Sequence, residues 1–202
     1  MRLFSRSDHH SDRWIVCGLG NPGERYANTR HNAGAMVVDE LVARTSSKLK
    51  SHKSGCLIGE TRLGGQKVTL ARPTSFMNES GRPLGQLMRF YKVGVDRLIL
   101  VHDEIDLPFG DVRLKLDGGT AGHNGLKSVV SHLGSKEFVR VRVGVGRPRA
   151  TGGAAGHVLD TFSSTERKEL PWLVSEGADA VEKILDLGIE RAMNDINTRD
   201  KV

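Results

Sequence analysis

Residues 18–32 read Gly18-Leu-Gly-Asn-Pro-Gly-Glu-Arg-Tyr-Ala-Asn-Thr-Arg-His-Asn32, and they continue a short apolar segment that begins at Trp14. An apolar strand followed by a glycine-rich turn is typical of the start of an α/β fold. The glycines satisfy the G-x-G-x-x-G spacing of a dinucleotide-binding turn. The same stretch ends in Arg-His-Asn, which a nucleotide cradle does not need. The choice between a cofactor turn and a chemically active loop decides most of the function.

The dinucleotide interpretation fails in its context. A Rossmann turn needs a helix that begins at the glycines, because the pyrophosphate sits on the N-terminus of that helix. Here helical periodicity resumes only near Asn32, and Pro22 removes one backbone N–H donor from the loop. Asp39 and Glu40 have nearly the spacing of the ribose partner but fall inside a helical pattern. An NAD-binding oxidoreductase is therefore kept as the less favoured alternative enzyme.

The rest of the chain alternates between strand and helix patterns, which predicts a single α/β domain. Short apolar or alternating runs predict strands at 14–19, 98–101, 112–116 and 138–146, with a hairpin at 56–71 around Gly64-Gly65. Amphipathic runs predict helices from Asn32, through 84–91, and from the glycines at 118–125 to Val130. Ser163 and Glu166 form a capping box that opens a further helix.

The composition limits where the protein is expected to act and what kind of partner it is expected to bind. The chain has 202 residues and a formal net charge of +6, which modestly favours a polyanionic partner. No apolar run approaches the ~20 residues of a membrane span, and no secretory signal is evident. Cys17 lies in an apolar run and reads as a buried free thiol, and Cys56 is far from it in sequence, so a reducing cytoplasm is expected.

The two ends and one basic stretch are expected to be poorly ordered or exposed. Residues 1–13 read as a flexible polar tail, residues 14–193 as the catalytic domain, and residues 194–202 as a frayed C-terminus. The basic residues between 48 and 53 are expected to form an exposed connection.

Polar groups that suit hydrolytic chemistry follow several of the predicted turns and strands. They are Asn21, His31 with Asn32, Asn78, Asp103, and His123 with Asn124. Histidine is the side chain most able to take a proton near neutral pH, and a carboxylate such as Asp103 could hold its imidazole in one tautomer. Asparagine amides both donate and accept, so they suit peptide groups or a water. Taken singly, each of these residues is more often structural.

The sequence offers no obvious covalent nucleophile, metal site or cofactor site. There is no G-x-S-x-G elbow, no H-E-x-x-H and no phosphate-cradling loop with lysine. His102, Asp103 and Asp106 could ligate a metal, but neighbours on an extended segment point in opposite directions. Attack by an activated water, without metal or cofactor, is the simplest expectation.

Basic residues alternate with apolar ones in two of the predicted strands. Arg113 and Lys115 alternate with apolar residues in one, and Arg140 and Arg142 in the other. Period-two alternation gives each strand one cationic face. If both strands share a sheet, these cations could meet phosphates. A solvated outer face explains the pattern nearly as well.

Four motifs in the same order resemble the bacterial peptidyl-tRNA hydrolase family. They are Gly18-Leu-Gly-Asn-Pro-Gly23 with Tyr26-x-x-Thr-Arg-His-Asn32, Phe76-Met-Asn-x-Ser-Gly81, His102-Asp-Glu-x-Asp-Leu-Pro108, and Gly122-His-Asn-Gly-Leu126. The resemblance implies a monomeric α/β domain with a twisted mixed β-sheet flanked by helices. It also implies hydrolysis of the ester between a peptide, or N-blocked aminoacyl group, and the 3′ ribose of tRNA.

The resemblance assigns roles to individual residues. It implies that His31 is the catalytic base, Asp103 its orienting acid, and Asn21 the residue that helps discriminate N-blocked from free aminoacyl groups. The implied substrate-contacting residues are Tyr26, Phe76, Met77, Asn78, His123 and Asn124. Lys115 and Arg142 match positions tied to tRNA phosphates. Asp117, Thr120 and Ala121 stand where many members carry more glycine.

A non-catalytic RNA-binding module is the alternative of another class, since the family's fold includes plastid intron-splicing factors. Such a module need not keep both His31 and Asp103, and this chain has both. The expected partner is peptidyl-tRNA, with no membrane association.

Overall fold

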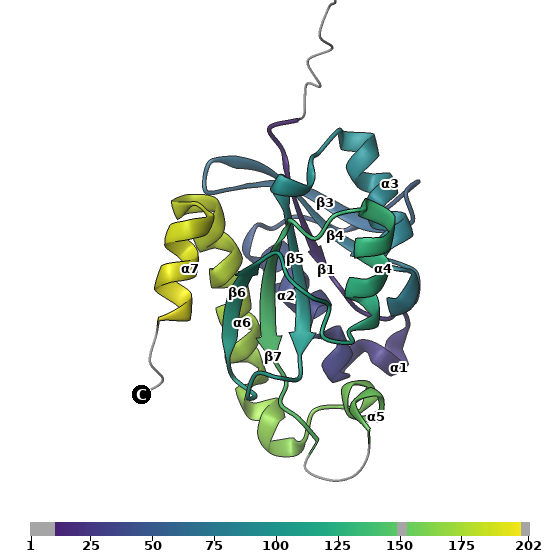
Figure 1. Cartoon of the computed structure of the whole chain (residues 1–202), viewed down its shortest axis with the longest axis vertical. Helices are drawn as coiled ribbons and strands as arrows, with labels where there is room; N and C mark the ends of the chain where they lie inside the picture. The colour runs from purple at the N-terminus through teal and green to yellow at the C-terminus, as the bar shows by residue number, and fades with distance from the viewer. Residues whose placement is uncertain (1–10, 149–152, 199–202) are drawn as a thin grey trace, which may run out of the picture.

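The structure is a computed structural model that describes residues 11–148 and 153–198. The strands are β1 (Trp14–Gly18), β2 (Lys50–His52), β3 (Cys56–Leu63), β4 (Gln66–Pro73), β5 (Leu98–Glu104), β6 (Val112–Leu116) and β7 (Val139–Gly144). They form one sheet in the order β2-β3-β4-β1-β5-β7-β6 (Figure 1). The central strands β4, β1, β5 and β7 are parallel, whereas β2, β3 and β6 join antiparallel. The expected α/β domain with a mixed sheet is confirmed.

The helices cover both faces of this sheet (Figure 1). They are α1 (Glu24–Ala27), α2 (Ala33–Arg44), α3 (Gly81–Tyr91), α4 (Asn124–Leu133), α5 (Ala154–Leu159), α6 (Ser164–Leu187) and α7 (Ile189–Asn197), with 3-10 turns η1 (Arg30–Asn32), η2 (Met77–Glu79) and η3 (Val95–Arg97). One core packs α2 and α6 against side chains such as Val101. A second core packs α3 and α4 against Leu100, on the opposite face. Successive residues of β5 point to opposite faces of the sheet, so this strand contributes side chains to both cores.

Two glycines allow α2 to pack directly on the strands that carry the site. A Cβ on Gly34 would lie 2.2 Å from the carbonyl oxygen of Val101, and a Cβ on Gly18 would lie 2.2 Å from the oxygen of Gly34. Backbone bonds join Leu19 to Val101 and Ala35 to Leu19, each at 3.0 Å. This contact brings the residues just before α2 beside the residues that end β5.

A buried arginine fixes the same segment from the other side. Arg30 donates to the carbonyl of Thr161 at 2.9 Å and to Oε2 of Glu166 at 2.6 Å. Glu166 also closes the predicted capping box with Ser163, which the structure confirms. Burial raises the pKa of Glu166, but the Ser163 and Arg30 contacts lower it more, so it stays ionised.

Two expectations about local structure are wrong. Residues 50–52 form the edge strand β2 rather than an exposed connection, because they pair with the start of β3. A four-residue helix, α1, does begin directly after Gly23, although the crossover helix is α2 as predicted. Residues 194–197 belong to α7, so a helix covers the first part of the end that was expected to fray.

Side-chain hydrogen bonds and an ion pair connect both ends of the described chain to the sheet. The amide of Asn197 binds both backbone groups of Leu114, and so satisfies part of the exposed edge of β6. Residues 1–10 of the predicted tail lie outside the described residues, but Arg13 already bonds Thr69 and pairs with Glu60, each at 2.9 Å.

Candidate active site

The centre of the site is a buried carboxylate held between two imidazoles. Nδ1 of His31 lies 2.9 Å from Oδ1 and 3.1 Å from Oδ2 of Asp103. Nε2 of His123 lies 3.0 Å from the same Oδ1. His31 comes from η1, Asp103 from β5, and His123 from the residue before α4. The structure thus brings together three residues that the sequence singled out in separate motifs.

The hydrogen bonds fix the tautomer of His123. Its Nδ1 accepts from the backbone N–H groups of Gly125 and Leu126, at 3.1 and 3.3 Å, and so caps α4. An accepting Nδ1 carries no proton, so the proton of neutral His123 is on Nε2, where it is donated to Asp103.

The same logic orients His31. An ionised carboxylate only accepts, so His31 donates from Nδ1. Its Nε2 then carries a lone pair, and no side chain of the described residues is bonded to that atom. His31 is 8 % exposed, beside a cavity. The arrangement presents one basic nitrogen to whatever enters that cavity.

Burial and hydrogen bonding set the charge of the neighbours. Burial raises the pKa of Asp103, but the bonds and charge of His123 and His31 outweigh it and leave that pKa below its ordinary value. Burial, with His123 nearby, lowers the pKa of His102 to about 3. His102 donates from Nδ1 to the carbonyl of Asp103 at 2.7 Å, and its Nε2 is buried without a partner. His102 is therefore a neutral, buried neighbour of Asp103.

Asn21 is held by a reciprocal bond that the sequence did not single out. The side chain of Asn32 accepts from the backbone N–H of Asn21 at 2.8 Å and donates to its carbonyl at 3.0 Å. Oδ1 of Asn21 in turn accepts the backbone N–H of Met77 at 2.9 Å. The glycine-rich turn is therefore joined to both η1 and η2.

The cavity at His31 encloses about 250 Å³ and gathers part of the predicted set. His31, Asp103, His123 and Asn124 line it, together with Glu104 and one face of α5. The α5 residues Ala154, Ala155 and Val158 were missed, because small apolar side chains carry no chemical signal in a sequence. Glu104 was missed although it directly follows Asp103 in a quoted motif.

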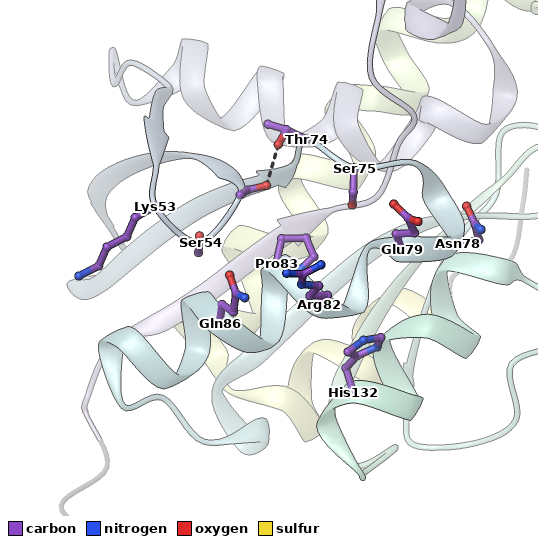
Figure 2. A pocket seen from close by; sticks show the side chains of 11 residues that line it. Lys53, Ser54, Thr74, Ser75, Asn78, Glu79, Arg82, Pro83, Gln86 and His132 are labelled. Carbon is purple, nitrogen blue, oxygen red and sulfur yellow. Dashed lines mark hydrogen bonds between the residues drawn. The ribbon is translucent and has the colours of Figure 1, made fainter.

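The other predicted site residues are not in the lining of this cavity. The rings of Tyr26 and Phe76 meet edge to face, 6.4 Å apart. Met77 is buried in the α3–α4 core, and its sulfur lies against Gly125. Asn78 lines a second pocket on the far side of η2, which Figure 2 shows.

The cationic residues of β6 and β7 do share one sheet, as the alternation required. Arg113 is the register partner of Arg142, and Lys115 of Arg140. Three of the four are already engaged: Arg113 with carbonyls at the end of α7, Arg140 with those of Gly118 and Gly119, and Arg142 with Glu104 at 3.0 Å. Lys115 alone is exposed and without such a bond. Most cations on this face of β6 and β7 therefore bind other parts of the protein, which the alternation did not predict.

The loop that Arg140 holds contains the residues that replace glycine. Asp117 and Ala121 have φ of 61° and 46°, in the left-handed region that favours glycine. The carbonyls of Gly118 and Gly119 accept from buried Arg140 at 2.7 Å, which fixes this path from β6 to His123.

Both cysteines are buried free thiols within the described chain. Burial raises the pKa of Cys17 well above its ordinary value and that of Cys56 to about 11. Neither lines the cavity at His31. Over the described residues, no helix is both long and apolar enough to span a membrane.

A carboxylate bonded to an imidazole beside a cavity, at the carboxyl ends of parallel strands, is an arrangement in an α/β fold that suits acid–base chemistry. Comparison with known proteins makes this specific. The family model described as peptidyl-tRNA hydrolase matches residues 15–202. The chain belongs to that family, whose members are hydrolases of an ester bond.

Relatives and solved structures agree over nearly the whole chain. A peptidyl-tRNA hydrolase of Frankia casuarinae is 57% identical over 90% of this chain and 92% of its own length. One from Mycobacterium avium is 51% identical over 91% of this chain and 96% of its own. The crystal structure of peptidyl-tRNA hydrolase from Acinetobacter baumannii superposes with a TM-score of 0.86 at 36% identity, covering 95% of this chain and 98% of that one.

Proposed function

We propose that this enzyme hydrolyses the ester that joins a peptide, or an N-blocked aminoacyl group, to the 3′ end of tRNA, by means of a water that His31 activates. The supporting observation is the bond from Nδ1 of His31 to Asp103, which leaves Nε2 as a free base at the cavity. Free tRNA and a peptide acid are the products, so the tRNA can be reused in translation.

Each proton in this mechanism has an assigned position. Nε2 of His31 takes a proton from water, and the hydroxide oxygen attacks the ester carbonyl. The resulting imidazolium donates from Nδ1 to Asp103, whose carboxylate stabilises the positive charge. When the C–O bond to the ribose breaks, Nε2 returns the proton to the leaving 3′ oxygen. No covalent intermediate forms on the protein.

The hydrogen bonds of His123 argue for acid–base chemistry rather than a metal. His31, Asp103 and His123 offer ligand atoms within 4.8 Å of one another, which could in principle hold an ion. A metal on Nε2 of His123 would force its proton onto Nδ1, toward the N–H groups of Gly125 and Leu126. The cap of α4 opposes that exchange, so we infer a site without metal or cofactor.

Amide and cationic side chains bind the two halves of the substrate in this proposal. Asn21, Asn78 and Asn124 recognise the peptide groups next to the ester, while Tyr26, Phe76, Met77 and His123 shape the cleft. Lys115 and Arg142 contact tRNA phosphates; Arg142 does so while still paired with Glu104, and Lys115 with a free ammonium. We expect a monomer that acts in the cytoplasm.

The decisive experiment measures release of labelled amino acid from N-acetyl-aminoacyl-tRNA. The wild type should release it, and His31→Ala should lose at least 100-fold in kcat while binding tRNA with little change. His52→Ala is the matched control, because His52 lies on β2 and its side chain contacts Ser54, Phe90 and Tyr91, none of which has a role in the mechanism. Near-normal turnover by His31→Ala would exclude the mechanism. Retained RNA binding without any release by the wild type would instead favour the non-catalytic module.

A further inference from the structure

A second, larger cavity lies beside η2, and Asn78 is its one lining residue with a role in the mechanism above. It encloses about 510 Å³ between α3, the C-terminal half of α4 and the turns that flank β3 and β4 (Figure 2). Its polar lining includes Lys53, Ser75, Asn78, Arg82, Gln86 and His132. Asn78 and Glu79 lie at one end of it and Lys53 at the other.

Several polar groups in this cavity have no partner within the described chain. The guanidinium of Arg82 makes neither a hydrogen bond nor an ion pair. Oγ of Ser75 is buried and unbonded, and it points into the cavity in Figure 2. His132 donates from Nδ1 to the carbonyl of Ser128 at 2.9 Å, so its Nε2 is a further unbonded polar atom. Of these groups, the Ser75 hydroxyl is buried, and a buried polar group without a partner is uncommon. Arg82 and His132 are exposed, so their unbonded nitrogen atoms are accessible to a ligand.

The charge of the cavity favours an anionic group. Lys53 lies 4.6 Å from the ring centre of Phe90 and, like Arg82, is not paired with a carboxylate. Glu79 is the one carboxylate in the lining, against these two cations. The unbonded hydroxyl and imidazole nitrogen add neutral hydrogen-bonding groups. A carboxylate with adjoining peptide amides matches this mixture of cations and amides.

The order of strands places this cavity on one side of the ester and the RNA-binding cations on the other. η2 follows β4, Asn21 follows β1, and Asp103 ends β5. Arg142 and Lys115 lie beyond, on β7 and β6. If tRNA reaches His31 from the β6–β7 side, the peptide leaves toward η2 and the second cavity.

The length of α4 between the two cavities indicates which residue of the peptide reaches the second cavity. Asn124 lines the cavity at His31 and His132 lines the second cavity, and the eight-residue step between them is about 12 Å of helix. An extended peptide covers ~3.4 Å per residue, so about four residues bridge the two cavities.

We infer that the second cavity binds the nascent peptide about four residues from the ester and selects an acidic side chain there. This inference rests on the proposed function, because it requires a peptidyl-tRNA in the cleft. A nucleic acid suits the cavity less well, because its successive phosphates would meet Glu79 and the apolar edge of Pro83, whereas a peptide brings a single carboxylate to the two cations. The contact acts on binding, so it should change KM more than kcat.

The test compares three substrates of this enzyme: N-acetyl-aminoacyl-tRNA, and two N-blocked pentapeptidyl-tRNAs with Glu or Lys at the fourth residue from the ester. The wild type should hydrolyse the Glu substrate with a kcat/KM about 5-fold above that of the Lys substrate. Arg82→Gln should remove this preference through KM, and Arg82→Glu should reverse it. Arg89→Gln is the matched control, since Arg89 lies on the same helix outside the cavity.

The single-residue substrate separates the possible failures. It cannot reach the second cavity, so Arg82→Gln should hydrolyse it at the wild-type rate. Equal hydrolysis of the Glu and Lys substrates by the wild type would overturn the inference and leave the proposed function intact. An equal loss on all three substrates in Arg82→Gln would show that Arg82 binds tRNA phosphate instead. No hydrolysis of any substrate by the wild type would overturn the proposed function itself.

Discussion

Nδ1 of His31 lies 2.9 Å from Oδ1 of Asp103, although 72 residues separate them in the chain. The same oxygen accepts Nε2 of His123 at 3.0 Å. Asp103 is therefore shared between the base and the residue that caps α4. Because both bonds converge on one atom, a change in either partner alters how firmly His31 is oriented.

Asp103→Asn should reduce kcat by at least 100-fold while tRNA binding changes little. The amide keeps the shape but cannot stabilise the imidazolium, and its NH₂ group would favour the wrong tautomer of His31. Rates on N-acetyl-aminoacyl-tRNA and a filter-binding measurement on tRNA check this. A kcat within 10-fold of wild type would contradict the assigned role of Asp103.

Two substitutions separate the two roles of His123. His123→Asn supplies a good N-cap and should cost little stability, whereas His123→Gln should lose up to ~1 kcal/mol of unfolding free energy. Both lose the bond to Asp103, so both should lower kcat. Urea unfolding and kcat measured on the same preparations test the separation. Equal stability of the two variants would show that the cap of α4 does not depend on Nδ1 of His123.

Asn32→Asp should lower activity without touching the proton-transfer residues. The carboxylate still accepts from the N–H of Asn21 but can no longer donate to its carbonyl, and the two oxygens now repel. We expect KM to rise severalfold, because Asn21 and the N–H of Met77 lose their fixed spacing. Asn28→Asp, an exposed change four residues earlier, is the control and should be nearly neutral. An unchanged KM would show that the reciprocal bond does not position the turn.

His102 predicts how stability depends on pH. Its pKa is about 3 in the folded protein against 6.5 when unfolded, so the unfolded chain binds more protons between these values and stability falls as pH falls below 6.5. From pH 7 to pH 5 this histidine should remove about 2 kcal/mol. The depressed pKa of Asp103 acts only below its ordinary 3.8, so it adds no slope in this range. Urea unfolding at both pH values should show a smaller loss of unfolding free energy for His102→Asn than for the wild type. Equal losses in the two proteins would contradict the role of His102.

Gly34→Ala should destabilise the fold by about 1–3 kcal/mol or more, because its methyl group would overlap the carbonyl oxygen of Val101. Gly156→Ala is the matched control: it lies in α5, with nothing within 4 Å of a Cβ, and should be neutral or slightly stabilising. Thermal unfolding compares the two. Equal melting temperatures would show that α2 can shift away from β1 and β5 without loss.

Sequence reasoning found the chemistry more readily than the contacts that hold it. His31, Asp103 and His123 stood out because they occur together beside turns in the quoted motifs, although each taken singly is more often structural. Arg30 and Asn32 belong to the same motif as His31, yet spacing alone did not reveal that Arg30 pairs with Glu166 or that Asn32 bonds back to Asn21. Nor did the sequence reveal that α7 runs to Asn197, whose bond to Leu114 is long-range.

The sequence by itself determined the α/β class, the hairpin, the capping box at Ser163 and the candidate catalytic residues. These follow from local periodicity, turn chemistry and side-chain type, which a short stretch of chain carries with it. Only the tertiary structure decided which groups meet: that Asp103 serves two histidines, that three of four strand cations are already bonded, and that a second cavity opens beyond η2. Contacts between distant segments depend on how helices pack on the sheet, and at Gly18 and Gly34 a single absent methyl group sets that packing.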